Sequence, residues 1–232
     1  MRIIIALTVV LSGYSTLAQE PTNFTKHELL GKIIPSSHPD FLLIPEEHCS
    51  KGGIYLRAEA LKALLSLIQA AADEGIELKV LSGTRPFGHQ KSIWERKWAR
   101  TRYMGWPDFE KAKDILTYSS MPGSSRHHWG TDVDLNSLEN SYFESGEGAE
   151  VYEFLKRCAK EFGFVQVYTS KEAGRTGYEE EKWHWSFMPI ASLMLEQYNK
   201  EIKSDDIRGF EGAGVADSIR IVRNYVNGIS TE

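Results

Sequence analysis

Two short segments of the chain carry side chains of the types that hold a catalytic metal ion. The first segment is 125–134, with the sequence SRHHWGTDVD, and the second is 181–185, with the sequence EKWHW. Between them they contain enough side chains for two imidazole ligands and one carboxylate ligand, and they leave a spare glutamate. A catalytic zinc site uses three protein ligands and keeps one position for water, and a carboxylate that does not bind the metal takes a proton from that water. These residue types therefore predict a zinc hydrolase.

Strand periodicity explains how the side chains of the first segment reach a common site. In a strand over 131–136, Asp132 and Asp134 point to one side, while Val133 points to the other side and enters the core. Gly130 allows the backbone to turn sharply just before this strand. We therefore expect the two carboxylates to line the metal site.

The second segment has the same alternation. In a strand around 182–187, Trp183 and Trp185 share one face and His184 projects from the opposite face. Glu181 comes at the entrance to this strand, where loop geometry leaves its side chain free to approach the site. A lone histidine is more often a satisfied polar residue than a ligand. That interpretation applies to the four histidines outside both segments, which are His27, His38, His48 and His89.

The chain begins with the pattern of a secretion signal. Arg2 precedes an apolar run over 3–11 that is too short to cross a bilayer, and residues 16–18 (Thr-Leu-Ala) have the small-residue form of a cleavage site. We expect an exported protein that begins near Gln19 and works in the periplasm, the cell envelope or the extracellular space. An N-terminal anchor is the alternative interpretation.

The composition argues against several other classes of protein. The chain has 232 residues and a formal net charge of −5, without a basic run, which is a poor composition for binding nucleic acid. No second apolar stretch is long enough to cross a membrane, and the length suffices for one good core. We expect a monomer with no nucleic-acid partner and no membrane span in the mature chain.

Apolar periodicity predicts a mixture of helices and strands. Helices are expected over 57–74, 88–103, 150–162, 189–202 and 215–227, and strands over 76–81, 131–136, 164–168 and 182–187. Four prolines make the segment 19–50 irregular. The expected organisation is a signal peptide (1–18), an irregular N-terminal segment (19–50), a zinc-site domain (51–202) and a C-terminal helical extension (203–232).

The two cysteines leave two interpretations open. Export makes a disulfide between Cys49 and Cys158 feasible. Cys158 also shares a helical stripe with Val151, Leu155 and Phe162, which is typical of a small core residue. Neither the number nor the spacing of the cysteines predicts a cysteine zinc site.

Three motifs in the chain resemble those of one enzyme family. Residues 125–134 read S-x-H-x-x-G-x-x-x-D and residues 181–185 read E-x-x-H-W, which resemble the two signatures of the D-alanyl-D-alanine carboxypeptidases of the VanY and VanX type. Residues 82–85 (Ser-Gly-Thr-Arg), with Gln90 five positions after the arginine, are similar to the S-G-Y-R-S…Q segment of that family. All three occur in the family's order, and the resemblance covers roughly residues 55–190.

The resemblance implies an α+β metallopeptidase fold, in which a small antiparallel sheet carries the zinc and helices pack around it. By this resemblance His127, Asp134 and His184 would bind one zinc ion per chain, and Glu181 would be the general base. Arg85 would stabilise the developing oxyanion or hold the substrate.

The same resemblance implies a substrate and a reaction. Ser125 and Gln90 would contact the D-alanine-containing stem peptide of bacterial peptidoglycan, and residues 51–202 would form a zinc D,D-peptidase domain. The implied reaction is hydrolysis of the terminal D-Ala-D-Ala amide bond. The alternatives are a peptidoglycan endopeptidase or L,D-carboxypeptidase of the same fold, and a non-catalytic, zinc-stabilised wall-binding domain.

The chain departs from the family's pattern at three places. Asp132 stands where the family usually has a small residue, and it could orient a ligand histidine from behind. Arg126 and His128 crowd the first motif, and Thr84-Arg85-Pro86 replaces Tyr-Arg-Ser. These changes leave the metal chemistry intact and bear on the choice of substrate.

Overall fold

An antiparallel sheet of four strands stands at the centre of the computed structural model, which describes residues 23–231. The strands lie in the order β3 (Val80–Ser82), β4 (Asp132–Leu135), β6 (His184–Phe187) and β5 (Phe164–Gln166). A second, two-stranded sheet pairs β1 (Phe41–Leu43) with β2 (Tyr55–Arg57). The expected α+β class with a small antiparallel sheet is confirmed, while the predicted signal peptide lies outside the described residues.

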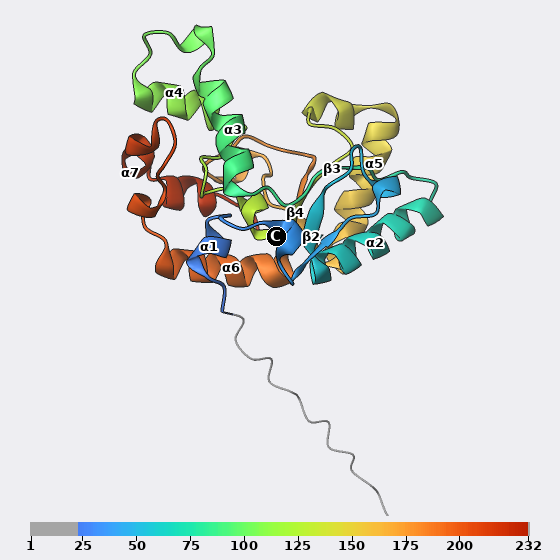
Figure 1. The fold of residues 1–232 in the computed structure, drawn as a ribbon. Helices are drawn as coiled ribbons and strands as arrows, with labels where there is room; N and C mark the ends of the chain where they lie inside the picture. The colour runs from blue at the N-terminus through green and yellow to red at the C-terminus, as the bar shows by residue number, and fades with distance from the viewer. Residues whose placement is uncertain (1–22, 232) are drawn as a thin grey trace, which may run out of the picture.

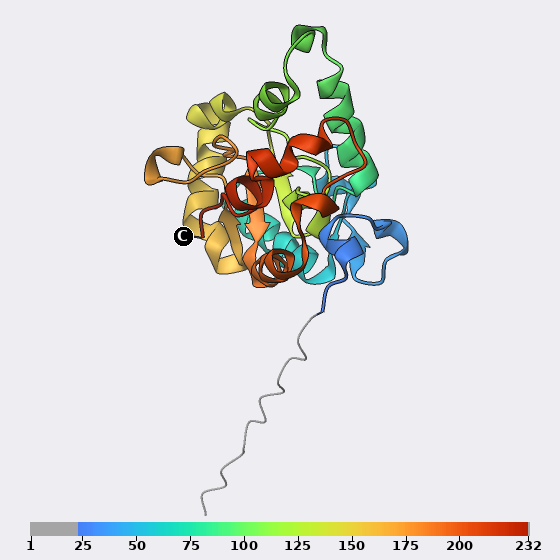
Figure 2. The same cartoon turned by 90° about the vertical axis from the view of Figure 1, so that its left-hand side faces the viewer.

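Helices pack around this sheet on several sides (Figure 1). They are α1 (Lys26–Leu29), α2 (Ala58–Asp73), α3 (Phe87–Trp98), α4 (Asp108–Ile115), α5 (Gly146–Cys158), α6 (Met188–Glu201) and α7 (Ala216–Ile219). Figure 1 shows α3 and α4 as a projecting lobe, with α2 and α5 on the other side of the molecule. Figure 2 shows α6 and α7 together on the side of the molecule that faces the viewer. Among the described residues, no helix combines the length and the apolar character needed to cross a membrane.

Two apolar clusters hold the layers together. In the first cluster, the apolar face of the sheet, with Val133 and Trp185, packs against α2 and α5 through residues such as Leu64 and Phe154. The second cluster joins α1, α3, α4, α6 and α7 around side chains such as Trp129. Because Val133 and Trp185 are committed to the core, alternation sends the neighbouring polar side chains to the opposite face.

The observed elements differ from the predicted ones mainly at their ends. The helix predicted over 57–74 is confirmed as α2, but the strand predicted over 76–81 begins only at Val80. Its partner β4 ends at Leu135, which pairs with Val80, so the residues before Val80 have no strand beside them. The single helix predicted over 215–227 is wrong, because Arg220 has a left-handed backbone (φ 56°) that ends α7.

The structure also adds elements that were not predicted and settles the state of the two cysteines. The helix predicted over 88–103 ends at Trp98, and the sequence patterns did not indicate α4. The described part of the segment predicted as irregular, 19–50, contains α1 and β1. Both cysteines are free thiols: Cys49 is buried in the first apolar cluster, and Cys158 packs against the same cluster.

Candidate metal centre and active site

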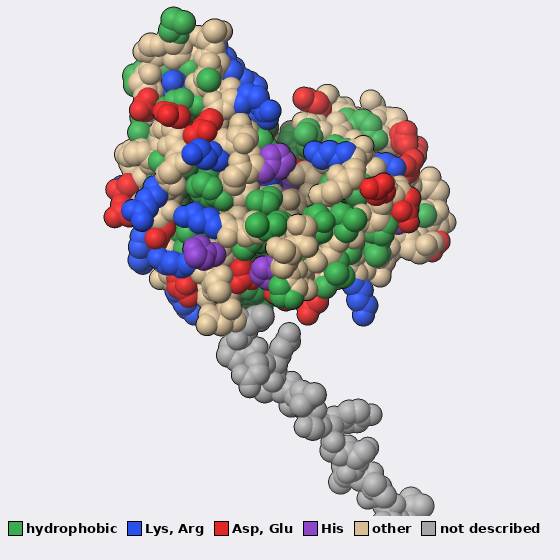
Figure 3. Space-filling view, in the orientation of Figure 1, with side chains coloured by type: hydrophobic (Ala, Val, Ile, Leu, Met, Phe, Trp, Pro, Cys, Tyr) green, Lys and Arg blue, Asp and Glu red, His purple; other side chains and the backbone are tan. Residues whose placement is uncertain are grey.

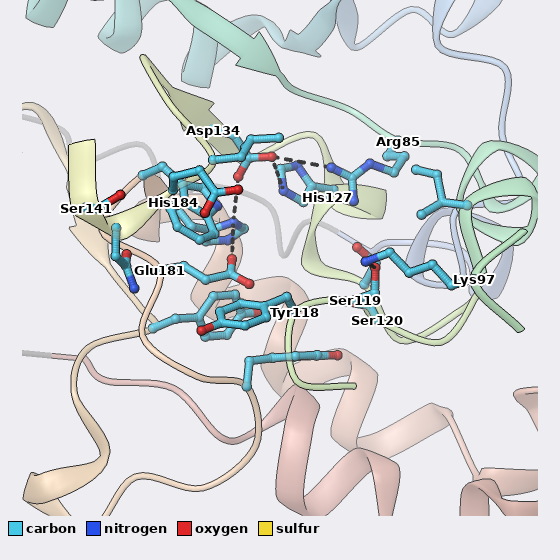
Figure 4. A pocket seen from close by; sticks show the side chains of 18 residues that line it. Arg85, Lys97, Tyr118, Ser119, Ser120, His127, Asp134, Ser141, Glu181 and His184 are labelled. Atoms are coloured by element: carbon cyan, nitrogen blue, oxygen red, sulfur yellow. Dashed lines mark hydrogen bonds and ion pairs between the residues drawn. The ribbon is translucent and has the colours of Figure 1, made fainter. Parts of the chain in front are cut away.

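The register of two neighbouring strands places the candidate ligands opposite each other. In the antiparallel pair of β4 and β6, Asp134 lies directly across from His184, so their side chains share one face of the sheet. His127 comes from the short helical turn Arg126–Trp129, which ends at Gly130 with a left-handed backbone (φ 73°). Figure 4 shows the three side chains converging on the same point.

The donor atoms of these three residues are spaced as a metal ion requires. One ligand atom from each of His127, Asp134 and His184 lies within 4.8 Å of the other two. Asp134 Oδ2 is 3.3 Å from His127 Nε2, and Asp134 Oδ1 is 3.1 Å from His184 Nδ1. Donors that each lie about 2.1 Å from a tetrahedral zinc ion are separated by about 3.4 Å. Two imidazoles and a carboxylate at this spacing therefore fit zinc.

Hydrogen bonds from behind set which nitrogen of each histidine faces the centre. His127 Nδ1 donates to the carbonyl oxygen of Gly83 at 2.8 Å, which leaves Nε2 as the acceptor nitrogen toward Asp134. His184 Nε2 donates to Asp132 Oδ2 at 2.9 Å, which leaves Nδ1 toward the centre. This is the usual way in which a protein fixes the tautomer of a metal-binding histidine.

Asp132 lies beneath the site and does not line the cavity, so the expectation that both carboxylates line it is wrong. Its contact with His184 agrees with the expectation that Asp132 orients a ligand histidine. The side chain is fully buried. It accepts hydrogen bonds from Arg126 Nε at 3.1 Å, from the hydroxyl of Ser186 at 2.8 Å and from His184 Nε2. Burial opposes its ionisation, but the charge of Arg126 and the hydrogen bond from His184 keep the pKa of Asp132 below its usual range. Asp132 is thus an ionised support for His184.

Glu181 stands at the same centre in a different electrostatic environment. Glu181 is 7 % exposed, and its Oε2 lies 3.7 Å from His184 Nδ1. Burial raises the pKa of Glu181 to about 7, and the negative charge of Asp134 acts in the same direction. A carboxylate with a pKa near neutrality is suited to accept and return a proton at ordinary pH.

Arg85 reaches the metal centre from the loop that follows β3. Its Nη2 lies 3.4 Å from Asp134 Oδ2 and donates to Ser82 Oγ at 2.9 Å, while Nη1 donates to Gln90 Oε1 at 3.0 Å. Gln90 is fully buried, and its own amide donates to the carbonyl of Ser120. The structure therefore places Gln90 behind Arg85, where it orients the guanidinium, and not at the surface of the cavity.

The candidate ligands, Glu181 and Arg85 line one cavity of about 660 Å³. The space-filling view shows the surface hollowed between the α3–α4 lobe and the lobe that carries α5 (Figure 3). The lining includes Arg85, Ser125 and Glu181 together with the three candidate ligands. Ser125 Oγ is buried and, among the described residues, has no hydrogen-bond partner. A buried hydroxyl without a partner at the wall of a cavity is available to a ligand.

Two residues support the site although the sequence assigned neither of them a role there. The ring of Tyr168 lies 4.6 Å from that of His184, centroid to centroid, and lines the cavity. His128, which crowds the first motif, is buried behind Arg85: its Nδ1 donates to the carbonyl of Arg85, and its Nε2 accepts from the backbone of Gly123. The adjacency of His128 to a candidate ligand could have indicated a supporting role, whereas nothing in the local pattern singles out Tyr168.

Comparisons with known proteins identify one family. A family model described as VanY, D-alanyl-D-alanine carboxypeptidase, matches residues 53–190. The putative carboxypeptidase YodJ of Bacillus subtilis (strain 168) is 29% identical over 211 residues, which cover 83% of this chain and 72% of that protein. The D-alanyl-D-alanine carboxypeptidase of Enterococcus faecalis (strain ATCC 700802 / V583) is 29% identical over 143 residues, which cover 58% of this chain and 52% of the relative, so the match spans about half of the relative's length.

A solved structure shows the same fold. It is a mutant of the vancomycin resistance D,D-pentapeptidase VanY from a VanB-type resistance cassette, in complex with Zn(II). Its sequence is 25% identical, the match covers 68% of this chain and 89% of that chain, and the TM-score is 0.51. Since the family model matches well over half of the chain, the protein belongs to the VanY family of D-alanyl-D-alanine carboxypeptidases and is a peptidase.

Proposed function

We propose that this protein is a zinc-dependent D,D-carboxypeptidase, which releases the terminal D-alanine from peptidoglycan stem peptides. The observation that carries the proposal is that Arg85 lies beside the candidate ligand Asp134, in the same cavity as Glu181. A guanidinium binds a carboxylate through two parallel hydrogen bonds. A carboxypeptidase must recognise the free terminal carboxylate of its substrate next to the bond that it cleaves, and Arg85 is suited to that task.

The residues of the cavity divide the work of amide hydrolysis among them. His127, Asp134 and His184 would hold one zinc ion per chain, which when bound polarises the scissile carbonyl and acidifies water. Glu181 takes a proton from the attacking water as the new carbon–oxygen bond forms. It then passes that proton to the leaving amine as the carbon–nitrogen bond breaks.

The remaining groups position the peptide. Arg85 pairs with the terminal carboxylate, and Gln90 holds the guanidinium in place. The unpartnered hydroxyl of Ser125 donates to or accepts from a polar group of the bound peptide. The buried Glu181 beside the ligands distinguishes this enzyme from a non-catalytic wall-binding domain, which has no use for a base. Because the substrate lies outside the cytoplasmic membrane, the proposal includes export and removal of residues 1–18.

Synthetic stem pentapeptides with a free or an amidated carboxyl terminus test the assignment. The unmodified enzyme should release one D-alanine from the free peptide, with kcat/KM about 10- to 100-fold lower on the amidated peptide, because a charge-assisted hydrogen bond is lost. In Arg85→Lys this preference should shrink while zinc is retained, since an ammonium cannot make the paired contact. Mass spectrometry of the products gives the bond that is cleaved.

The outcomes separate the candidate activities. Equal cleavage of free and amidated peptides by the unmodified enzyme contradicts carboxypeptidase action and indicates an endopeptidase. Release of D-alanine from a tetrapeptide but not from the pentapeptide indicates an L,D-carboxypeptidase. Omission of zinc, or addition of a chelator, should abolish all release.

A further inference from the structure

A second cation lies in the same cavity as Arg85. Lys97, on the last turn of α3, lines the cavity and is half-buried. Its ammonium donates to Ser119 Oγ at 2.8 Å, and no described carboxylate forms an ion pair with it. Burial lowers the pKa of Lys97, the charge of Arg100 acts in the same direction, and the carboxylate of Glu181 offsets only part of this effect. An ammonium that loses water without forming an ion pair is costly, unless an anion binds beside it.

The helix α3 places Lys97 further along the cavity than Gln90, the residue that holds Arg85. Gln90, Ile93 and Lys97 recur at intervals of three and four residues, so they lie on one face of α3. Gln90 holds Arg85 at one end of that face, and Ile93 and Lys97 line the cavity further along. Seven helical residues span about 10 Å. Figure 4 shows the side chain of Lys97 extending into the pocket toward Ser119, on the same side as Arg85.

An extended peptide bound along this face would place a second acidic group near Lys97. Extended chains advance about 3.3–3.6 Å per residue, so roughly 10 Å corresponds to two residues and the reach of a side chain. With the terminal carboxylate of a pentapeptide at Arg85, the side chain near Lys97 belongs to the third residue, on the amino side of the scissile bond.

We infer that Lys97 binds a side-chain carboxylate on the third residue of the stem pentapeptide. The enzyme thereby prefers peptides whose third residue, a diamino acid, carries a side-chain carboxylate over peptides whose third residue lacks one. This inference rests on the proposed function. It makes Lys97 a specificity-determining residue, with Ser119 holding its ammonium toward the substrate. The peptide is then recognised through two carboxylates, one at each end of the α3 face.

Two pentapeptides that differ only at the third residue test the inference. One carries meso-diaminopimelate, which has the side-chain carboxylate, and the other carries L-lysine, which does not. The unmodified enzyme should favour the diaminopimelate peptide in kcat/KM by about 10- to 100-fold, mainly through KM. Lys97→Met, which keeps the apolar stem and removes the charge, should erase this preference by losing activity on the diaminopimelate peptide alone. Lys97→Arg should retain most of it.

Lys91→Met is the matched control, because Lys91 lies on the same helix but does not line the cavity and contacts the carbonyl of Gly209 instead. That variant should keep the full preference. An equal loss of activity on both peptides in Lys97→Met, or an unchanged preference, overturns the inference. Zinc content and thermal unfolding identify a misfolded variant, and the preference of Lys97→Arg then decides. If the unmodified enzyme cleaves neither peptide, the proposed function fails first.

Discussion

At the scale of single residues, two carboxylates in one cavity have opposite acidities. Asp134 lies between the imidazoles of His127 and His184, which outweigh burial and hold its pKa below the usual range. Glu181 is also buried, but the positive charges near it oppose the effect of burial less strongly. Burial therefore raises the pKa of Glu181 to about 7. Neighbouring titratable groups whose pKa values are shifted in opposite directions usually have different roles in catalysis. Asp134 is suited to bind a cation, and Glu181 is suited to carry a proton.

Replacing Glu181 separates these roles experimentally. Glu181→Gln should still bind one zinc per chain, but hydrolysis should fall by about 10²–10⁴-fold, because the proton acceptor is gone while the three ligands remain. His184→Ala should instead lose the metal. Elemental analysis of both variants, beside their turnover of stem pentapeptide, makes the comparison. Near-normal turnover in Glu181→Gln would assign the base to another carboxylate.

At the scale of elements, Gly130 joins the turn that carries His127 to the strand that carries Asp134. Its backbone is left-handed (φ 73°), and an added Cβ would lie 2.3 Å from Cε1 of Phe41. Phe41 belongs to the neighbouring small sheet, and the carbonyl of Gly130 accepts the backbone N–H of Arg57 from the same sheet. The position therefore requires glycine for both conformational and steric reasons.

Gly130→Ala should lower the free energy of unfolding by about 3 kcal/mol, of which about 1–2 come from the left-handed backbone and about 1–3 from overpacking against Phe41. Gly105→Ala provides the control: Gly105 is also left-handed (φ 78°), but no atom lies within 4 Å of its added Cβ. It should cost only the backbone contribution. Urea unfolding of the two variants gives the difference, and equal destabilisation would show that Phe41 moves aside without cost.

At the scale of the whole molecule, Arg57 connects the N-terminal segment to the turn that carries His127. Its guanidinium contacts Glu28 at 2.7 Å, Asp40 at 3.0 Å and the carbonyl of Trp129 at 2.9 Å. Burial opposes the ionisation of Glu28, but hydrogen bonds from Arg57 and Thr25 hold its pKa below the usual value. The folded state therefore binds this proton less tightly than the unfolded state does.

Stability should consequently depend on pH through Glu28. The ionised carboxylate of Glu28 contributes fully to the free energy of unfolding above its pKa in the unfolded chain, which is about 4.3. This contribution is lost as the pH falls through the lower pKa of the folded state. Glu28→Gln should thus be less stable than the unmodified protein at neutral pH, and the gap should narrow below pH 4. Glu59→Gln, which alters an exposed carboxylate, should change little at either pH. A gap in unfolding free energy that stays constant down to low pH would contradict this linkage.

The sequence by itself predicted the candidate metal ligands and the family, and the family is confirmed. Alternation in two strands predicted that Asp134 and His184 would share a face, and their cross-strand pairing confirms it. Such inferences succeed because strand periodicity and motif spacing are local properties of the chain. The same local reasoning failed at Arg220, where a single left-handed residue ends a helix that apolar periodicity would continue.

The positions of the residues that surround the candidate ligands depend on the tertiary structure. Asp132 and Asp134 are equivalent in the pattern, yet one lies buried against Arg126 and the other lines the cavity, because burial depth depends on what packs against each end of the strand. Gln90 was expected at the substrate and lies behind Arg85. Lys97 gave no signal in the sequence, since its position opposite Ser119 depends on how α3 docks against a loop 22 residues further along the chain. Contacts between distant segments arise from packing, which local patterns do not encode.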